Sequence, residues 1–132
     1  MHTLDQVNQA LIKGEYFWVD IARDGVTLFE RPGHPLASPQ PLTPADAYEM
    51  AKRYFESKRP RIDRWFVTVD LQRTQADKDT GFLTNAVFSL HQAIETLYGC
   101  FLLVRTLYIP RLHNIKFLHS LSEGLDRRLI AA

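Results

Sequence analysis

Cysteine is nearly absent from this sequence, and so are the signals that direct a protein into or across a membrane. The single Cys100 excludes a disulfide within the chain and a zinc site built from several cysteines. Residues 1–15 lack the basic start and apolar run of a secretory signal, and the apolar stretch 99–104 is far too short to span a bilayer. These absences predict a soluble, cytoplasmic protein with no membrane partner.

The sequence also lacks an excess of either charge. It has 16 basic and 15 acidic residues and a formal net charge of +1, so no overall field would draw the chain to nucleic acid. Any binding of nucleic acid must therefore depend on a local cluster of cations.

The short motifs of several enzyme classes are missing as well. There is no GxGxxG, no Walker loop and no GxSxG, which argues against common nucleotide-binding folds and hydrolases. The histidines show no HExxH or similar metal-ligand spacing; they are His2, His34, His91, His113 and His119. We therefore expect no metal and no cofactor, and the motifs present do not make a complete active site.

What the sequence does contain is the composition of one globular domain, with 132 residues of which 45% are hydrophobic and 23% charged. Thr3 and Gln6 have the spacing of a capping box, and apolar residues follow at helical intervals. This pattern predicts a helix over residues 3–13 that ends at Gly14.

Residues 16–30 allow two structures. One is a hairpin that turns at Asp24-Gly25, and the other is a helical turn that ends at Gly25, followed by a strand over 26–30. The acidic residues of this segment could form a magnesium site or simply a solvated loop; they are Asp20, Asp24 and Glu30.

Prolines then divide the chain. Residues 31–41 hold four of them, which predicts a linker without regular structure. A helix should begin at Thr43, because a hydroxyl cap followed by Pro44 is typical of a helix start. At Pro60 we expect a kink or a break, and a further helical stretch that runs out before Gly81.

The strongest pattern covers residues 82–108. Apolar residues alternate spacings of three and four there, as the inward positions of a coiled coil do; they are Leu83, Val87, Leu90, Ile94, Leu97, Phe101 and Val104. A second stripe lies beside them, so we predict a central, buried helix with Leu90, Ile94, Leu97 and Phe101 in the core. Ile109-Pro110 should end it, and a short helix should follow. The fold class is therefore mainly α, an antiparallel helical bundle with a short N-terminal α/β element.

Two groups of polar residues are candidates for chemistry. Basic and amide side chains gather around the proline turn and the next helix start, where free amide groups and arginine forks suit phosphate; they are Arg105, Arg111, His113, Asn114 and Lys116. A solvated helix connection would have the same composition. His91 and Glu95 lie four apart on one helical face, and we interpret them as a buried polar pair rather than as metal ligands.

With these segments in place, residues 86–121 resemble the HEPN domain (higher eukaryotes and prokaryotes nucleotide-binding). The family has a His-Gln-Ala-x-Glu run on a long helix, a proline turn, and a Lys/Arg-x-His-Asp/Asn helix start. The matching residues are His91, Gln92, Ala93, Glu95, Pro110, Arg111, His113 and Asn114. The resemblance implies a helical bundle that binds nucleotide or RNA and forms a homodimer, in a setting such as a toxin–antitoxin pair.

Residues 16–30 resemble the end of a minimal nucleotidyltransferase domain, in which a short helix, a glycine and a last strand precede a HEPN domain. The resemblance favours the helix-and-strand alternative. It implies a transferase remnant over residues 1–30, a linker over 31–42, and a HEPN-like bundle over 43–132 that could lack its last helix. The transferase's Gly-Ser loop and Asp-x-Asp pair have no counterpart here, so we expect a partner transferase domain in cis or in trans.

Many HEPN domains are ribonucleases that place four to six residues between an arginine and a histidine. Here seven residues separate Arg105 from His113, and one separates Arg111 from it. We therefore expect a binding and dimerisation module that is not catalytically complete. The alternatives are a metal-independent ribonuclease that uses His113 with Arg105 or Arg111, and a purely structural oligomerisation fragment.

Overall fold

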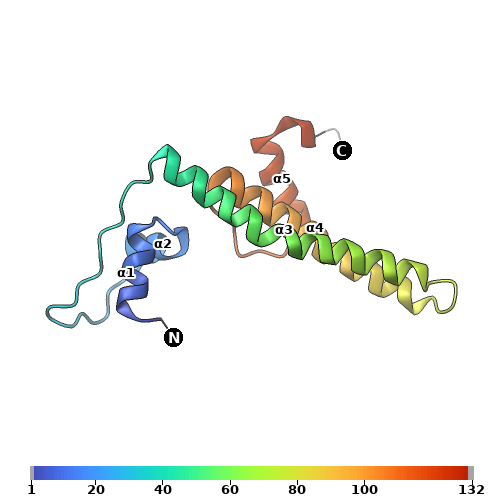
Figure 1. Cartoon of the computed structure of the whole chain (residues 1–132), viewed down its shortest axis with the longest axis horizontal. Helices are drawn as coiled ribbons and strands as arrows, with labels where there is room; N and C mark the ends of the chain where they lie inside the picture. The colour runs from blue at the N-terminus through green and yellow to red at the C-terminus, as the bar shows by residue number, and fades with distance from the viewer. Residues whose placement is uncertain (1, 131–132) are drawn as a thin grey trace. The chain divides into compact units, whose positions relative to one another are not determined.

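The computed structural model describes residues 2–130 and shows a mainly helical chain (Figure 1). Its elements are α1 (Leu4–Ile12), α2 (Tyr16–Asp24), α3 (Pro44–Thr74), α4 (Gly81–Thr106), α5 (Ile115–Leu125) and the 3-10 turn η1 (Arg127–Leu129). The predicted helical fold class is confirmed. The chain forms two compact units, unit 1 up to Tyr48 and unit 2 from Glu49.

Unit 1 begins with the predicted capping box. The amide of Gln6 donates to Thr3 Oγ1 at 3.3 Å, and Gln6 Oε1 accepts from the Thr3 amide at 3.0 Å. Gly14 follows α1 with a φ of +67°, the left-handed conformation that glycine adopts at little cost. α1 contacts α2 and buries Leu11, so the two short helices share a small apolar core.

The predicted strand over residues 26–30 is wrong for this chain. The helix before it forms as α2, but the described range 2–130 contains no strand, and Val26, Leu28 and Phe29 are 84%, 95% and 83% exposed. A strand needs the backbone of a neighbouring strand to satisfy its amide and carbonyl groups, and unit 1 offers none in the described range. The segment therefore stays irregular.

The proline-rich segment has no regular structure, as predicted, yet it is attached to α1. Asn8 Oδ1 accepts from the Ala37 amide at 2.8 Å, and Asn8 Nδ2 donates to the Pro35 carbonyl at 3.3 Å. One amide side chain thus holds the segment at two adjacent points.

Replacing Asn8 with alanine should release this segment, because each of the two hydrogen bonds contributes about 0.5 to 1.5 kcal/mol. We expect the Ala37 amide to exchange its hydrogen as fast as an unstructured peptide does, measured by NMR hydrogen exchange. Asn8→Asp keeps the acceptor for the Ala37 amide and should retain part of the protection. Unchanged exchange in Asn8→Ala would contradict the attachment.

α3 starts where the sequence predicts. Thr43 Oγ1 accepts from the Asp46 amide at 3.2 Å and donates to the Asp46 carboxylate at 2.6 Å, with Pro44 at the first helical position. The helix does not break at Pro60 but continues to Thr74, so of the two expected alternatives the break is wrong and the continuation is correct. Pro60 has no amide proton, which leaves the Glu56 carbonyl without its helical partner.

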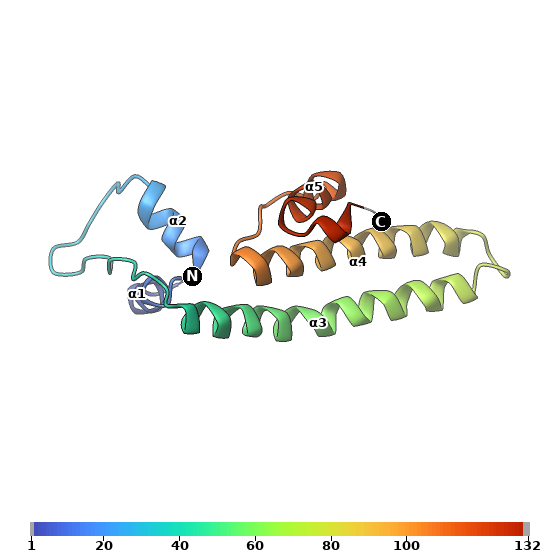
Figure 2. The same cartoon turned by 90° about the horizontal axis from the view of Figure 1, so that it is seen from above.

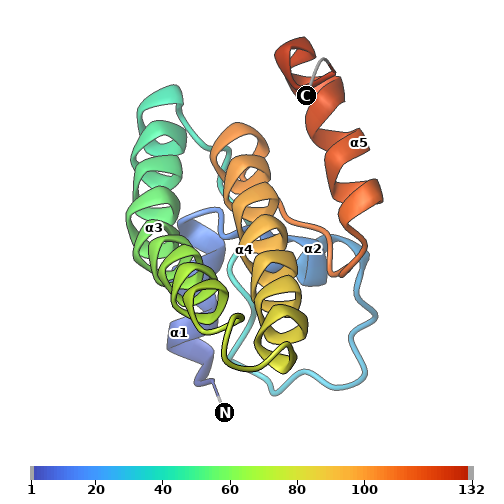
Figure 3. The ribbon, with the colours of Figure 1, turned by 90° about the vertical axis from the view of Figure 1, so that its right-hand side faces the viewer.

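In unit 2, α4 lies between α3 and α5 (Figures 2 and 3). Ser89 Oγ is 2.8 Å from Gln72 Oε1 of α3, and α5 contacts α4 directly. α4 has more buried residues than any other described helix, which confirms its central position; they are Ala86, Ser89, Ala93, Gly99, Cys100, Leu102 and Leu103.

The predicted core positions on α4 are wrong in part. Leu90 and Leu97 are 39% and 45% exposed, and Ile94 and Phe101 are only half-buried. The buried face is the adjacent one, which is rich in small residues such as Ala86, Ser89 and Ala93. Small side chains allow another helix to approach closely, whereas the larger ones stay on an open face.

α4 is also the one helix in residues 2–130 that is long and apolar enough to cross a membrane. Length and composition are the whole basis of this finding, and a core helix of a soluble protein meets the same criteria. In this chain α4 contacts α5 and carries His91 and Glu95 near its middle, as a helix of a bundle can.

Candidate anion-binding site

The segment between α4 and α5 carries most of the polar residues singled out in the sequence. Leu107 ends α4 in the left-handed region with a φ of +58°, and Thr106 Oγ1 accepts from the Tyr108 amide at 3.3 Å. Ile109 then packs on Gly99, where a Cβ would lie 2.5 Å from the Ile109 Cδ1 atom. Gly99 therefore lets the segment lie close against α4.

This packing creates a cleft of about 400 Å³ between α3, α4 and the segment before α5. Its basic side chains come from two directions: Lys58 and Arg61 from α3, and Arg111 and His113 from the segment after α4. Gln92 and Glu95 of α4 are among the remaining polar groups on its wall. The cleft therefore combines several cations with a small number of hydrogen-bonding groups.

Glu95 and His113 form the closest polar contact in the cleft. His113 Nδ1 lies 2.6 Å from Glu95 Oε1, and a carboxylate oxygen accepts, so Nδ1 is the donor. The Glu95 side chain is only 18% exposed, whereas that of His113 is 87% exposed. With Nδ1 bound to Glu95, Nε2 is the ring nitrogen that a ligand can reach.

The expected buried pair of His91 and Glu95 is looser than the sequence suggests. His91 is 45% exposed, and its Nδ1 lies 3.9 Å from Glu95 Oε2. The short contact of Glu95 is therefore with His113 and not with His91. Within residues 2–130 no group of three or more histidine, cysteine or acidic side chains is placed to hold a metal ion.

The five predicted phosphate-binding residues do not all lie at the cleft. Arg111 and His113 line the cleft, but Asn114 caps α5 by accepting from the Phe117 amide at 3.2 Å, and Lys116 lies on α5 outside the cleft lining. Asn114 thus contributes to helix stability rather than to the cleft wall.

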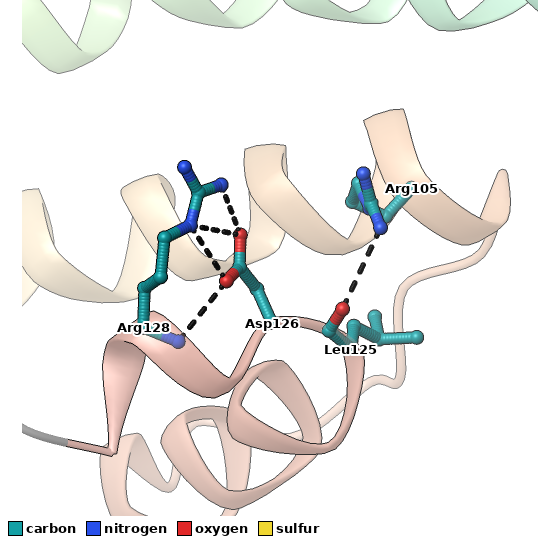
Figure 4. A network of polar contacts seen from close by, with 4 residues as sticks. All are labelled: Arg105, Leu125, Asp126 and Arg128. Atoms are coloured by element: carbon teal, nitrogen blue, oxygen red, sulfur yellow. Dashed lines mark hydrogen bonds and ion pairs between the residues drawn. The ribbon is translucent and has the colours of Figure 1, made fainter.

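Arg105 lies at a different place, next to the end of α5 (Figure 4). Its Nη2 donates to the Leu125 carbonyl at 3.5 Å, and its charge adds to that of Arg128 beside Asp126. The Arg128 hydrogen bonds lower the pKa of Asp126 to about 2. Arg105 therefore supports the C-terminal turn of unit 2 and does not line the cleft.

Sequence reasoning missed Lys58 and Arg61, which belong to a helix more than thirty positions before Gln92. One feature of the sequence could have identified Lys58 as a residue that points toward another helix. It falls between Tyr54 and Ile62 on the inward face of α3, where a cation interrupts an otherwise apolar stripe. A charge at such a position points toward a neighbouring helix.

Cys100 also lines the cleft, but its thiol is shielded from solvent. Burial raises the pKa of Cys100 above its ordinary value, while the charge of Lys58 acts in the opposite direction. The residue is 4% exposed.

Since the thiolate is the reactive form, Cys100 should react with a thiol reagent at pH 7 to 8 at least about ten times more slowly in the folded protein than in urea. The rate should rise only at a more alkaline pH than it does for the unfolded chain. The absorbance of released thionitrobenzoate measures both rates. Equal rates at pH 8 would contradict the burial of Cys100 between α3 and α4.

No family model matches the sequence, and no curated protein is significantly similar to it. The geometry of the cleft therefore carries the functional argument.

Proposed function

We propose that unit 2 is a HEPN-type module that binds the phosphate groups of a nucleotide or of RNA in the cleft beside Glu95. The observation that carries the proposal is the convergence of Lys58 and Arg61 with Arg111 and His113 on one cleft. The chain has a net charge of only +1, so this local cluster supplies an attraction that the whole protein lacks.

The chemistry of the cleft suits phosphate. Arginine presents two parallel N–H groups to phosphate oxygens, and lysine adds a point charge. A volume of about 400 Å³ lies in the range of small-molecule sites and matches a nucleotide or a short piece of RNA chain. Gln92 and Thr96, which also line the cleft, offer hydrogen bonds to a base or sugar.

The proposal includes a partner. A HEPN-type module associated with a nucleotidyltransferase domain, in cis or in trans, would hold nucleotide or RNA near the active site of that domain. The chain itself carries no transferase motif, so binding and not nucleotidyl transfer is the function proposed for it.

Fluorescence anisotropy with labelled ATP, labelled GTP and a labelled single-stranded oligoribonucleotide tests the binding. We expect at least one of the three to bind, and Lys58→Ala/Arg61→Ala to weaken that binding at least about tenfold, because two charged contacts are lost. Lys52→Ala/Arg53→Ala removes the same charge from exposed positions of α3 outside the cleft and is the matched control.

Absence of binding to all three ligands would favour a purely structural oligomerisation role. Binding that both double variants retain equally would exclude the cleft as the site.

A metal-independent ribonuclease is the second candidate, because Glu95 fixes the ring of His113 next to Arg111. His113 Nε2 would accept the proton of a ribose 2′-hydroxyl, and the O2′–P bond would form as the P–O5′ bond breaks. Water would protonate the departing O5′, leaving a 2′,3′-cyclic phosphate and a 5′-hydroxyl, with charge on the phosphate stabilised by Arg111. Arg105 lies outside the cleft lining, so Arg111 is the arginine that fits this role.

RNA incubated with the protein in EDTA tests this candidate. Cleavage that disappears in His113→Ala and falls in Glu95→Gln would support it. RNA that remains intact while the oligoribonucleotide binds would leave binding alone as the function.

A further inference from the structure

We infer that the ligand of the cleft is a single-stranded RNA of several nucleotides, and that one of its bases stacks on Trp65 in a second hollow next to the cleft. The hollow has a volume of about 330 Å³, and Arg61, Arg64, Trp65 and Thr68 line it from one face of α3. Stacking at Trp65 rests on the proposed function, because it needs the cleft to hold a phosphate of the same strand.

Arg61 connects the hollow to the cleft, because this residue lines both. Arg61 and Trp65 are four positions apart in α3, so their Cβ atoms lie about 5 to 6 Å apart on the helix surface. Each of the two spaces has the size of a small-molecule site. A phosphate bound by Arg61 can therefore join one nucleotide in the cleft to the next nucleotide in the hollow.

Trp65 presents a flat apolar surface to the hollow. The residue is half-buried, and its indole Nε1 atom is buried with no hydrogen-bond partner in residues 2–130. The N–H group therefore faces the protein, and the part of the ring that a ligand meets is carbon. A nucleobase is the part of a nucleotide that stacks on such a surface, and stacking accepts every base because each has a π face.

The polar groups beside Trp65 suit the edge of a base. Arg64 is exposed and forms no ion pair with a described carboxylate, whereas Arg59 on another side of α3 pairs with Asp63 at 3.8 Å. The Arg64 N–H groups can therefore donate to the carbonyl and ring-nitrogen acceptors of a base. Thr68 Oγ1 donates to the Arg64 carbonyl at 2.9 Å, so its oxygen can accept from a base amino group.

This arrangement favours a single strand over a duplex. In double-stranded RNA the bases are already paired and stacked on one another, so none of them can lie on Trp65. Lys58 in the cleft and Trp65 in the hollow are seven residues apart, which is about 10 Å along α3. Neighbouring nucleotides of one extended strand can therefore reach both.

Fluorescence anisotropy with labelled ATP and a labelled oligouridylate of about ten nucleotides tests the stack. Trp65→Ala should weaken oligonucleotide binding at least about fivefold, the loss expected for one base stack, and should leave ATP binding unchanged. Trp65→Phe keeps an aromatic ring and should retain most of the affinity. Phe66→Ala is the matched control and should bind like wild type, because Phe66 is 41% exposed on α3 but does not line the hollow.

Tryptophan fluorescence provides a second measurement that leaves Trp65 intact. The chain has two tryptophans, so Trp18→Phe leaves Trp65 as the only one. The oligouridylate should quench the emission of this variant with the same midpoint as the anisotropy titration, because a base stacked on the excited indole quenches it. The duplex of the oligouridylate with oligoadenylate should leave the emission unchanged.

The outcomes separate the hollow from the cleft. Lys58 lines the cleft but not the hollow. If Lys58→Ala weakens oligonucleotide binding while Trp65→Ala and the emission show no effect, the hollow holds no base and the inference fails, but the proposed function stands. If Trp65→Ala weakens ATP binding as much as oligonucleotide binding, one nucleotide spans both spaces and the assignment to RNA is wrong. Absence of binding to wild type would overturn the proposed function and the inference together.

Discussion

Leu118→Ala should lower the free energy of unfolding of unit 2 by about 2 to 5 kcal/mol, the usual cost of emptying a fully buried leucine site. Leu118 is 1% exposed and belongs to α5, which contacts α4. For a unit of this size, the melting temperature should fall by about 10 °C or more. Urea unfolding followed by circular dichroism measures the change.

Leu121→Ala is the control for this prediction. Leu121 lies on the same helix and loses the same atoms, but it is 38% exposed, so its surroundings can adapt and its cost should be less than half as large. Equal destabilisation by the two substitutions would show that α5 does not pack on α4 through Leu118.

The helix starts could be predicted from the sequence because capping is local. Thr3 with Gln6, and Thr43 with Asp46, satisfy amide groups within three residues, and both contacts form as expected. Information confined to one turn of chain is sufficient for such a prediction. Pro60 shows the limit of local rules, since they would end the helix there, whereas α3 continues through it to Thr74.

The inward face of α4 could not be predicted in the same way. Two faces have a suitable repeat, and hydrophobicity favours the one that carries Leu90 and Leu97. The structure buries the one that carries Ala93 and Cys100. The choice depends on how closely the neighbouring helices can approach α4, and a single sequence does not specify this.

The prediction of a strand over residues 26–30 was wrong for a related reason. Its β-branched and aromatic residues have the composition of a strand, but pairing depends on backbone groups supplied from elsewhere. The cleft could be predicted only in part for the same reason, because some of its residues come from a distant part of the sequence. Arg111 and His113 are close in sequence and were found, whereas Lys58 and Arg61 approach them only through the packing of α3 on α4.

With RNA as the ligand, the number of cations in the cleft should determine how affinity depends on salt. Each phosphate neutralised on a single strand contributes about −0.7 to the slope of log K against log salt concentration. If Lys58, Arg61 and Arg111 each neutralise one phosphate, wild type should give a slope of about −2 between 50 and 300 mM NaCl. Lys58→Ala/Arg61→Ala should retain only the Arg111 contact and a slope of about −0.7.

The slope distinguishes phosphate binding in the cleft from a general attraction of RNA to the charged protein surface. Lys52→Ala/Arg53→Ala lowers the net charge by the same amount but leaves the cleft intact, so its slope should equal that of wild type. Anisotropy titrations at four or more salt concentrations provide the three slopes. If the two double variants gave the same slope, phosphate would be bound by the protein surface as a whole, and the cations of the cleft would have no special part in it.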